Sequence, residues 1–170
     1  MELMELARER YSVRKYDPRP VEAEKLERIL AVGALAPSAK NQQPQHVYVL
    51  ESPAAIEKIR GITRCAFDAP VVLLVCGDRD AAWTNPFNGR NSAEMDCSIL
   101  ATHMMLEVYE LGLGCTYVCA FHADAIRKAF DLPDHIVPYM LLPIGYPADD
   151  CVPSERHFQR YPLEHTVKFV

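Results

Sequence analysis

Residues 94–111 read Glu-Met-Asp-Cys-Ser-Ile-Leu-Ala-Thr-His-Met-Met-Leu-Glu-Val-Tyr-Glu-Leu, the longest helical stretch in the chain. Its apolar side chains surround much of the helix axis, a pattern typical of a helix that is buried on most sides. Gly112 and Gly114 follow, and glycine commonly ends a helix. This stretch therefore predicts the central core helix against which the rest of the chain packs.

Shorter elements are expected on both sides of this helix. Residues 70–76 are apolar and rich in β-branched side chains, which is typical of a strand buried on both faces. Further strands are expected at 46–50, 116–119 and 139–144, and further helices at 3–10, 22–33, 53–60 and 123–130. Because helices and strands alternate irregularly, we expect one domain over residues 1–170 with an α/β or α+β sandwich fold.

The composition excludes several classes of protein. Of the 170 residues, 49% are hydrophobic and 24% are charged, as in ordinary globular domains. The net charge of −5 argues against a nucleic-acid-binding module, and no apolar run approaches the roughly 18 residues of a membrane span. The N-terminus is acidic, unlike a secretory signal, and the six cysteines show no disulfide framework. We therefore expect a cytoplasmic protein with reduced thiols.

The segment Arg10-Tyr-Ser-Val-Arg14 is the first candidate for a binding site. In an extended chain alternate residues share a face, so Arg10, Ser12 and Arg14 would project together. Two guanidinium groups and a hydroxyl on one face suit an anion such as phosphate. The alternative is a solvated basic patch that pairs with Glu9 or Asp17.

The second candidate is the polar loop Pro37-Ser-Ala-Lys-Asn-Gln-Gln-Pro44, which lies between a helix and a strand. Its amides offer donors and acceptors that could bind the edge of a planar heterocycle. Ordinary turn chemistry, in which Ser and Asn cap neighbouring elements, is the alternative.

Two other patterns are weaker. Gly112-Leu-Gly114 follows a helix instead of opening one, and no dinucleotide or P-loop glycine motif occurs, so a Rossmann or P-loop site is not expected. Cys115, Cys119 and His122 are possible zinc ligands, but their spacing matches no established zinc pattern. We interpret these cysteines as core thiols and expect no metal site.

Taken in chain order, several segments resemble the nitroreductase family of flavin-dependent oxidoreductases. They are Arg10-Tyr-Ser-Val-Arg-Lys-Tyr16, Ala36-Pro-Ser38, Asn41-x-Gln43-Pro44, Asp96, Glu110-Leu-Gly-Leu-Gly114, Leu132-Pro133, Leu142-Pro-Ile-Gly-Tyr-Pro147, Pro153-x-x-Arg156 and Arg160-Tyr-Pro-Leu-Glu164. The resemblance covers nearly the whole chain. It implies an α+β fold, a three-layer α/β/α sandwich with a mainly antiparallel central sheet, in a homodimer that exchanges its C-terminal tails.

The resemblance further implies one FMN per subunit at the dimer interface. The cofactor-binding residues that it assigns are Arg10, Tyr11, Ser12, Arg14, Pro37, Ser38, Asn41, Gln43, Cys119, Ala120, Pro143, Gly145 and Arg156. Arg10 and Ser12 would hold the phosphate and ribityl chain, with Arg156 or Arg160 completing the phosphate site. Arg14 would lie near flavin N1 and the C2 carbonyl, where it would stabilise negative charge.

The remaining assignments surround the flavin ring. Pro37, Ser38, Asn41 and Gln43 would come from the partner chain. A strand at 117–120 would pass the ring, with a backbone N–H around Cys119–Ala120 facing N5, and Pro143-Ile-Gly145 would lie against the ribityl chain. Two departures from the family pattern stand out: Tyr117 replaces a frequent Trp, and Ser154 replaces a frequent Lys.

The implied activity is hydride transfer from NAD(P)H through flavin N5 to an electron-poor acceptor such as a nitroaromatic or a quinone. Because the flavin carries the chemistry, we expect ping-pong kinetics and no dedicated acid–base residue. Two alternatives remain: a non-enzymatic flavin-binding or storage module, and a relative of the same fold specialised for dehalogenation or flavin fragmentation. The segment 77–92 is short for a dedicated lid over the substrate, which argues mildly against the specialised relative.

Overall fold

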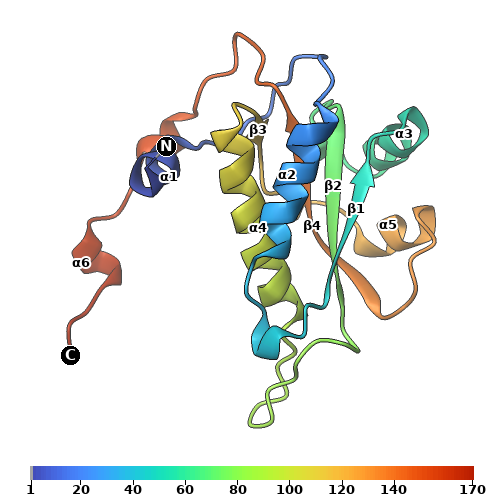
Figure 1. Cartoon of the computed structure of the whole chain (residues 1–170), viewed down its shortest axis with the longest axis vertical. Coiled ribbons are helices and arrows are strands. Elements are labelled where there is room, and N and C mark those ends of the chain that lie inside the picture. Colours follow the sequence, from blue (N-terminus) through green and yellow to red (C-terminus); the bar gives the residue numbers. More distant parts are fainter. Residues whose placement is uncertain (1) are drawn as a thin grey trace.

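A four-stranded antiparallel sheet forms the middle of the protein. The structure is a computed structural model that describes residues 2–170 (Figure 1). The strands lie in the order β1-β2-β4-β3, with β1 at Gln45–Leu50, β2 at Val71–Asp78, β3 at Gly114–Cys115 and β4 at Ile136–Gly145. The long antiparallel pairings of β2 with β1 and with β4 place β2 in the interior of the sheet.

The α-helices of the described chain are α1 (Leu3–Glu9), α2 (Ala23–Ala34), α3 (Pro53–Ile62), α4 (Ala93–Glu110), α5 (Ala123–Ala129) and α6 (Leu163–Thr166). Four of them, α2 to α5, cover the two faces of the sheet, whereas α1 and α6 lie away from it (Figure 1). Figure 1 shows α2 and α4 side by side on one face of the sheet, and α3 and α5 on the other side. The expected α+β fold, a three-layer sandwich with a mainly antiparallel sheet, is confirmed.

Strand β2 explains why the sequence carries a continuous apolar run. Its residues Val71, Leu73 and Val75 belong to the core cluster under α2 and α4, whereas the residues between them belong to the cluster under α3 and α5. Successive side chains of a strand point to opposite faces, so a strand covered on both faces must be apolar throughout.

The long helix α4 is buried on the side that faces the sheet and α2. Cys97, Leu100, Met104 and Val108 are among its buried residues, while Ile99 is 37% exposed. The described chain therefore leaves part of an apolar helix uncovered. The prediction that this helix is buried on most sides is therefore confirmed only in part, since a single subunit leaves one side of α4 exposed.

The expected strand at 116–119 is wrong in its position. Strand β3 pairs Gly114 and Cys115 with β4, and the pairing then stops until Val118, which exchanges two backbone hydrogen bonds with Leu141. The register opposes residue 116 to Pro143, which has no N–H to donate. The missing donor interrupts the ladder at this point.

The extended segment 10–16 lies against β3. Ser12 forms a parallel bridge with Cys115, and the Val13 N–H donates to the Cys115 carbonyl at 3.0 Å. Val13 is only 1% exposed because it packs on Gly114, where a Cβ would come within 2.4 Å of its Cγ2. Gly114 is thus required by close approach of two chain segments, while Gly112, with φ of 72°, turns the chain out of α4.

The C-terminal segment extends away from the body of the protein (Figure 1). It carries Phe158, Tyr161, Leu163 and Phe169, all of them exposed large side chains. The predicted exchange of this tail between subunits stays a prediction. No helix among residues 2–170 is long and apolar enough to cross a membrane.

We predict that Gly114→Ala destabilises the protein by about 1–3 kcal/mol, because the new methyl group would overlap Val13 and lift segment 10–16 off the sheet. Urea unfolding of the two proteins measures the change. Gly61→Ala is the matched control: Gly61 lies near the end of α3 with nothing within 4 Å of an added Cβ. That control should be neutral or more stable by up to about 1 kcal/mol, and equal behaviour of the two variants would contradict the packing argument.

Candidate functional site

A hollow of about 220 Å³ lies where the two ends of the chain meet. It is lined by Arg10, Tyr11, Ser12, Arg14, Ser154, Arg156, His157 and Arg160, and we call it the anion hollow. The extended segment supplies the first four residues and the C-terminal segment supplies the others. Arg10, Ser12 and Arg14 line the hollow together, as the alternation predicts, and Val13 points into the core, but Tyr11 lines the hollow as well.

The four guanidinium groups of the anion hollow lack acidic partners. Within residues 2–170, none of them forms an ion pair. Arg14 donates to the Ser12 carbonyl at 3.3 Å, and Arg160 donates to the Gln159 carbonyl at 2.8 Å. The alternative that Arg10 and Arg14 pair with Glu9 or Asp17 is therefore wrong. Four like charges in one small hollow repel one another, and an anion would relieve that repulsion.

Tyr11 connects the extended segment to the C-terminal segment. Its hydroxyl donates to the Cys151 carbonyl at 3.1 Å, and its ring meets that of His157 edge-on at 6.3 Å. Burial, followed by the proximity of Cys151, raises the pKa of the Tyr11 hydroxyl. An ion pair between Lys15 and Asp150 ties the same two segments together. The predicted cofactor residue Tyr11 thus contributes its ring to the hollow while its hydroxyl holds the tail.

A second hollow, of about 370 Å³, begins where the first one ends. Its lining residues are Arg10, Ser12, Thr102, Met105, Leu106 and Tyr117, and we call it the α4 hollow. Arg10 and Ser12 line both hollows, so the two are adjacent. The Tyr117 hydroxyl lies 3.1 Å from the Ser98 hydroxyl of α4, which holds the tyrosine along the helix. A charged hollow beside a hollow with both polar and apolar walls suits a ligand with an anionic terminus and a flat body.

The loop 118–121 follows Tyr117 and exposes backbone donors. Cys119 and Ala120 are both exposed, and within residues 2–170 neither N–H donates a hydrogen bond. The Ala120 carbonyl accepts a hydrogen bond of 2.8 Å from the hydroxyl of Thr63. Thr63 was not predicted from the sequence. A threonine directly after a helix signals a cap, but nothing local indicates that it contacts residue 120.

The loop at 37–43 is held at the beginning of α4. The buried carboxylate of Asp96 accepts hydrogen bonds from the Ala39 N–H at 2.9 Å and from the Ser92 hydroxyl at 2.7 Å. Inside the loop, the Ser38 hydroxyl accepts from the Gln43 N–H at 3.0 Å. Asn41 and Gln43 have φ of 56° and 50°, a conformation that costs non-glycine residues energy and often occurs at functional sites.

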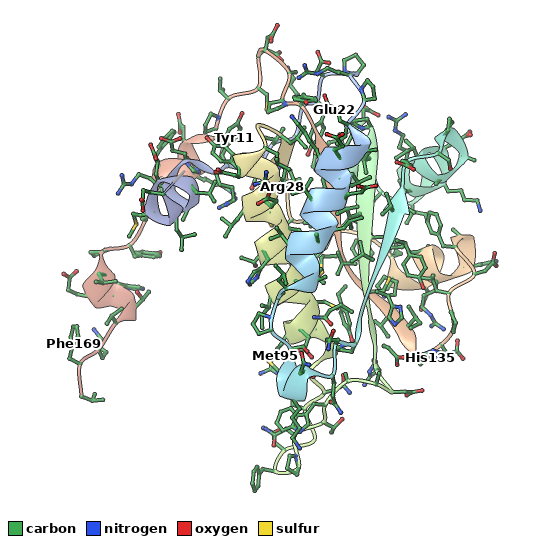
Figure 2. All side chains as sticks on the ribbon, viewed as in Figure 1. Tyr11, Glu22, Arg28, Met95, His135 and Phe169 are labelled. Atoms are coloured by element: carbon green, nitrogen blue, oxygen red, sulfur yellow. The ribbon has the colours of Figure 1, made fainter. Side chains whose placement is uncertain are left out.

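This loop does not reach the two hollows of its own chain. None of Pro37, Ser38, Asn41 and Gln43 lines them. Figure 2 labels Tyr11 near one end of α4 and Met95 near the other end. Thr102 and Leu106 lie six and ten residues beyond Asp96, which corresponds to about 9–15 Å along the helix. One chain therefore carries two separate sets of the predicted site residues.

Three further residues of the predicted site, Pro143, Gly145 and Arg14, do not line the α4 hollow. Pro143 and Gly145 do not line either hollow; both are buried, and the Tyr16 hydroxyl lies 2.9 Å from the Pro143 carbonyl oxygen. Their contact with a cofactor stays a prediction. Arg14 lines the anion hollow and not the α4 hollow, a position that favours a phosphate contact over the predicted one near flavin N1.

The cysteines of the weaker metal hypothesis are not brought together as a site. Cys115 is buried whereas Cys119 is exposed, and burial raises the pKa of the Cys115 thiol to about 12. Within residues 2–170 no group of three or more His, Cys, Asp or Glu side chains is arranged to hold a metal ion.

Comparison with known proteins shows the family of the chain. A family model described as "Nitroreductase family" matches residues 7–68 and 64–146. A protein of Methanothermobacter thermautotrophicus named as an NADH dehydrogenase/NAD(P)H nitroreductase is 31% identical over 157 residues, which cover 88% of this chain and 80% of its own. The crystal structure of a nitroreductase family protein from Clostridium difficile 630 is 43% identical, with a TM-score of 0.93 over 99% of this chain and 98% of that one.

A nitroreductase structure from Exiguobacterium sibiricum 255-15, solved in complex with FMN, has the same fold. Its TM-score is 0.86, and the match covers 100% of this chain and 98% of that chain at 22% identity. At this identity the likeness concerns the fold alone.

We predict that inorganic phosphate stabilises the protein, once it is stripped of small molecules, relative to chloride at equal ionic strength. A phosphate concentration ten times its Kd gives about 1.4 kcal/mol, which appears as a higher Tm in thermal unfolding. Arg156→Gln should lose most of this difference because its guanidinium lines the anion hollow. Arg90→Gln is the control, since the exposed Arg90 contributes only backbone contacts. Equal Tm values in the two salts would contradict an anion site.

Proposed function

The chain belongs to the nitroreductase family of oxidoreductases, and we propose that it is an FMN-dependent enzyme that uses NAD(P)H to reduce an electron-poor acceptor. One observation carries the proposal: four guanidinium groups, without acidic partners among residues 2–170, line a hollow that adjoins a second hollow beside α4. A mononucleotide with a flat ring carries a dianionic phosphate at one end, which would suit the anion hollow. A chain and an aromatic body follow the phosphate, and they would suit the α4 hollow.

The residues present fit FMN. Its phosphate carries nearly two negative charges, for which Arg10, Arg14, Arg156 and Arg160 supply several charged donors. Ser154 stands where many members of the family carry a lysine. The two arginines of the C-terminal segment supply positive charge in its place, so the lysine is not needed for charge balance. The FMN in the Exiguobacterium structure supports the same choice of cofactor.

The chain's own residues would bind and orient the flavin. Bound FMN supplies the hydride chemistry, from NAD(P)H to an acceptor such as a nitroaromatic or a quinone. The free N–H of Cys119 or Ala120 would donate to flavin N5 from the side of the ring that faces the protein. None of the six residues lining the α4 hollow is an Asp, Glu, His or Lys, which supports a mechanism without a dedicated acid–base residue.

The complete site would need two subunits. The proposed homodimer places Pro37, Ser38, Asn41 and Gln43 of one chain against the flavin of the other, and exchanges the C-terminal tails. The exposed Ile99 of α4 and the exposed aromatic residues of the tail support this assembly. In it, the two separate sets of site residues found on one chain would belong to two different flavins.

Absorbance spectroscopy tests the function directly. The purified protein, or the protein mixed with FMN, should show a flavin band that NADH or NADPH bleaches under anaerobic conditions and that a nitroaromatic or quinone restores. A flavin band that neither nucleotide bleaches would favour the non-enzymatic flavin-binding module. Failure to bind FMN at all would contradict the proposal.

We predict that Arg10→Ala and Arg156→Ala each weaken FMN binding by about 1.5–3 kcal/mol, a roughly 10- to 150-fold rise in Kd, because each removes a charged hydrogen bond to the phosphate. Flavin fluorescence titration measures the Kd. Arg90→Ala, outside both hollows, should bind FMN like the unaltered protein. Unchanged affinity in both hollow variants would rule out the phosphate assignment.

We further predict that two defective variants restore one another in mixed dimers. The first combines Arg10→Ala with Arg156→Ala. The second combines Asn41→Gly with Gln43→Gly, and glycine accepts the positive φ at both positions. Random mixing puts both defects into one site of each mixed dimer and leaves the other site intact, so about one quarter of all sites should bind FMN normally.

The measurement is flavin bound after co-expression, compared with each variant expressed alone. If co-expression recovers no binding above the two separate variants, the flavin does not lie between two chains.

A further inference from the structure

The loop at 118–121 is fastened to the rest of the protein at two points. Val118 exchanges backbone hydrogen bonds of 3.0 and 2.9 Å with Leu141 in the sheet. Two residues later, the Ala120 carbonyl accepts a hydrogen bond of 2.8 Å from Thr63, which belongs to the connection between α3 and β2. The part of the loop that would face the flavin ring is thus held by one side chain from a different segment.

Thr63 is itself fixed in place. It is only 7% exposed, and its N–H donates to the Ile59 carbonyl at the end of α3. Its hydroxyl oxygen accepts a hydrogen bond of 3.1 Å from the Cys65 N–H. Because that N–H approaches the lone-pair side of the oxygen, the single hydroxyl hydrogen is directed to the Ala120 carbonyl.

The hydrogen bonds of the loop leave two donors without an acceptor. The Phe121 N–H turns back to the Cys119 carbonyl at 3.1 Å, and Thr63 occupies the Ala120 carbonyl. Both carbonyl groups are therefore engaged within the protein. Within the part of the chain that the structure describes, the N–H groups of Cys119 and Ala120 have no acceptor, and both residues are exposed.

We infer that Thr63 is a positioning residue, whose hydroxyl sets the orientation of the 119–120 backbone so that a free N–H can donate to flavin N5. The inference rests on the proposed function and extends it to a side chain that does not line either hollow. A hydrogen bond to N5 acts on the atom that receives hydride, so a small displacement of the donor changes the reaction more than it changes cofactor affinity, which the arginines dominate.

The test compares Thr63→Ala with Thr63→Ser. Both variants remove the methyl group, and only the serine keeps a hydroxyl that can donate to Ala120. Thr116→Val is the control, because Thr116 is 2% exposed but its hydroxyl makes no hydrogen bond within residues 2–170. Each variant is loaded with FMN. Stopped-flow absorbance then gives the rate of flavin reduction by NADH or NADPH, and dye equilibration gives the reduction potential.

In Thr63→Ala we expect FMN to remain bound while flavin reduction slows roughly 10- to 100-fold, with the KM for the nucleotide within about 3-fold of the unaltered protein. The reduction potential should shift, since a donor at N5 has moved. Thr63→Ser should recover the rate to within about 3-fold, and Thr116→Val should match the unaltered protein. If Thr63 had a structural role alone, Thr63→Ala would lower the Tm. It would not slow flavin reduction at an unchanged KM, and it would not shift the reduction potential of the flavin.

The inference is overturned if Thr63→Ala is reduced at the original rate with the original potential, or if Thr63→Ser is as slow as Thr63→Ala. If Thr63→Ala does not fold, Thr63→Val replaces only the hydroxyl by a methyl group, and its comparison with the unaltered protein tests the same hydrogen bond. An unaltered protein that binds no flavin, or whose flavin neither nucleotide reduces, overturns the proposed function and with it this inference. A failure of the variants alone overturns only the assignment of Thr63.

Discussion

The packing of Val13 on the backbone of Gly114 sets the position of the whole N-terminal segment. With no side chain at residue 114, the extended segment comes close enough to β3 for Ser12 to pair with Cys115. That pairing turns Arg10, Ser12 and Arg14 outward together. It also places Tyr11 where its hydroxyl reaches the Cys151 carbonyl and holds the C-terminal segment beside it. One close contact between two backbones thus brings arginines from opposite ends of the sequence into a single hollow.

The four positive charges of the anion hollow repel one another, so their arrangement costs free energy when no anion is bound. Arg60 pairs with Asp68, whereas other exposed arginines such as Arg90 form no ion pair among residues 2–170, so a single unpaired arginine says little. Four arginines line the anion hollow together without a carboxylate partner among the described residues, although the protein carries more acidic than basic residues. Charges kept together without counter-charges are best explained by a ligand that brings its own, and a phosphate monoester needs this number and type of donors.

Helix α4 contributes both to the proposed flavin site and to the proposed dimer. One part of it lines the hollow that would take the flavin, while its first turn holds the loop at 37–43 through Asp96. A rigid helix keeps these two regions apart within one subunit, and the proposed homodimer would bring them to one cofactor from two copies. Ile99 of the same helix is 37% exposed in the described chain. Binding and dimerisation would then depend on one element.

Local residue patterns were enough to predict most of the fold and the shared face of Arg10, Ser12 and Arg14. The period-2 alternation of Arg10, Ser12 and Arg14, the continuous apolar run of β2 and the length of α4 each have a local physical cause. The interrupted ladder at Thr116 was not predicted, because it depends on Pro143 lying opposite in the register. Nor could local patterns bring the arginines of the C-terminal segment beside those of segment 10–14, or show that Thr63 reaches Ala120. Those contacts join residues distant in sequence, and they form only when the sheet and its connections pack together.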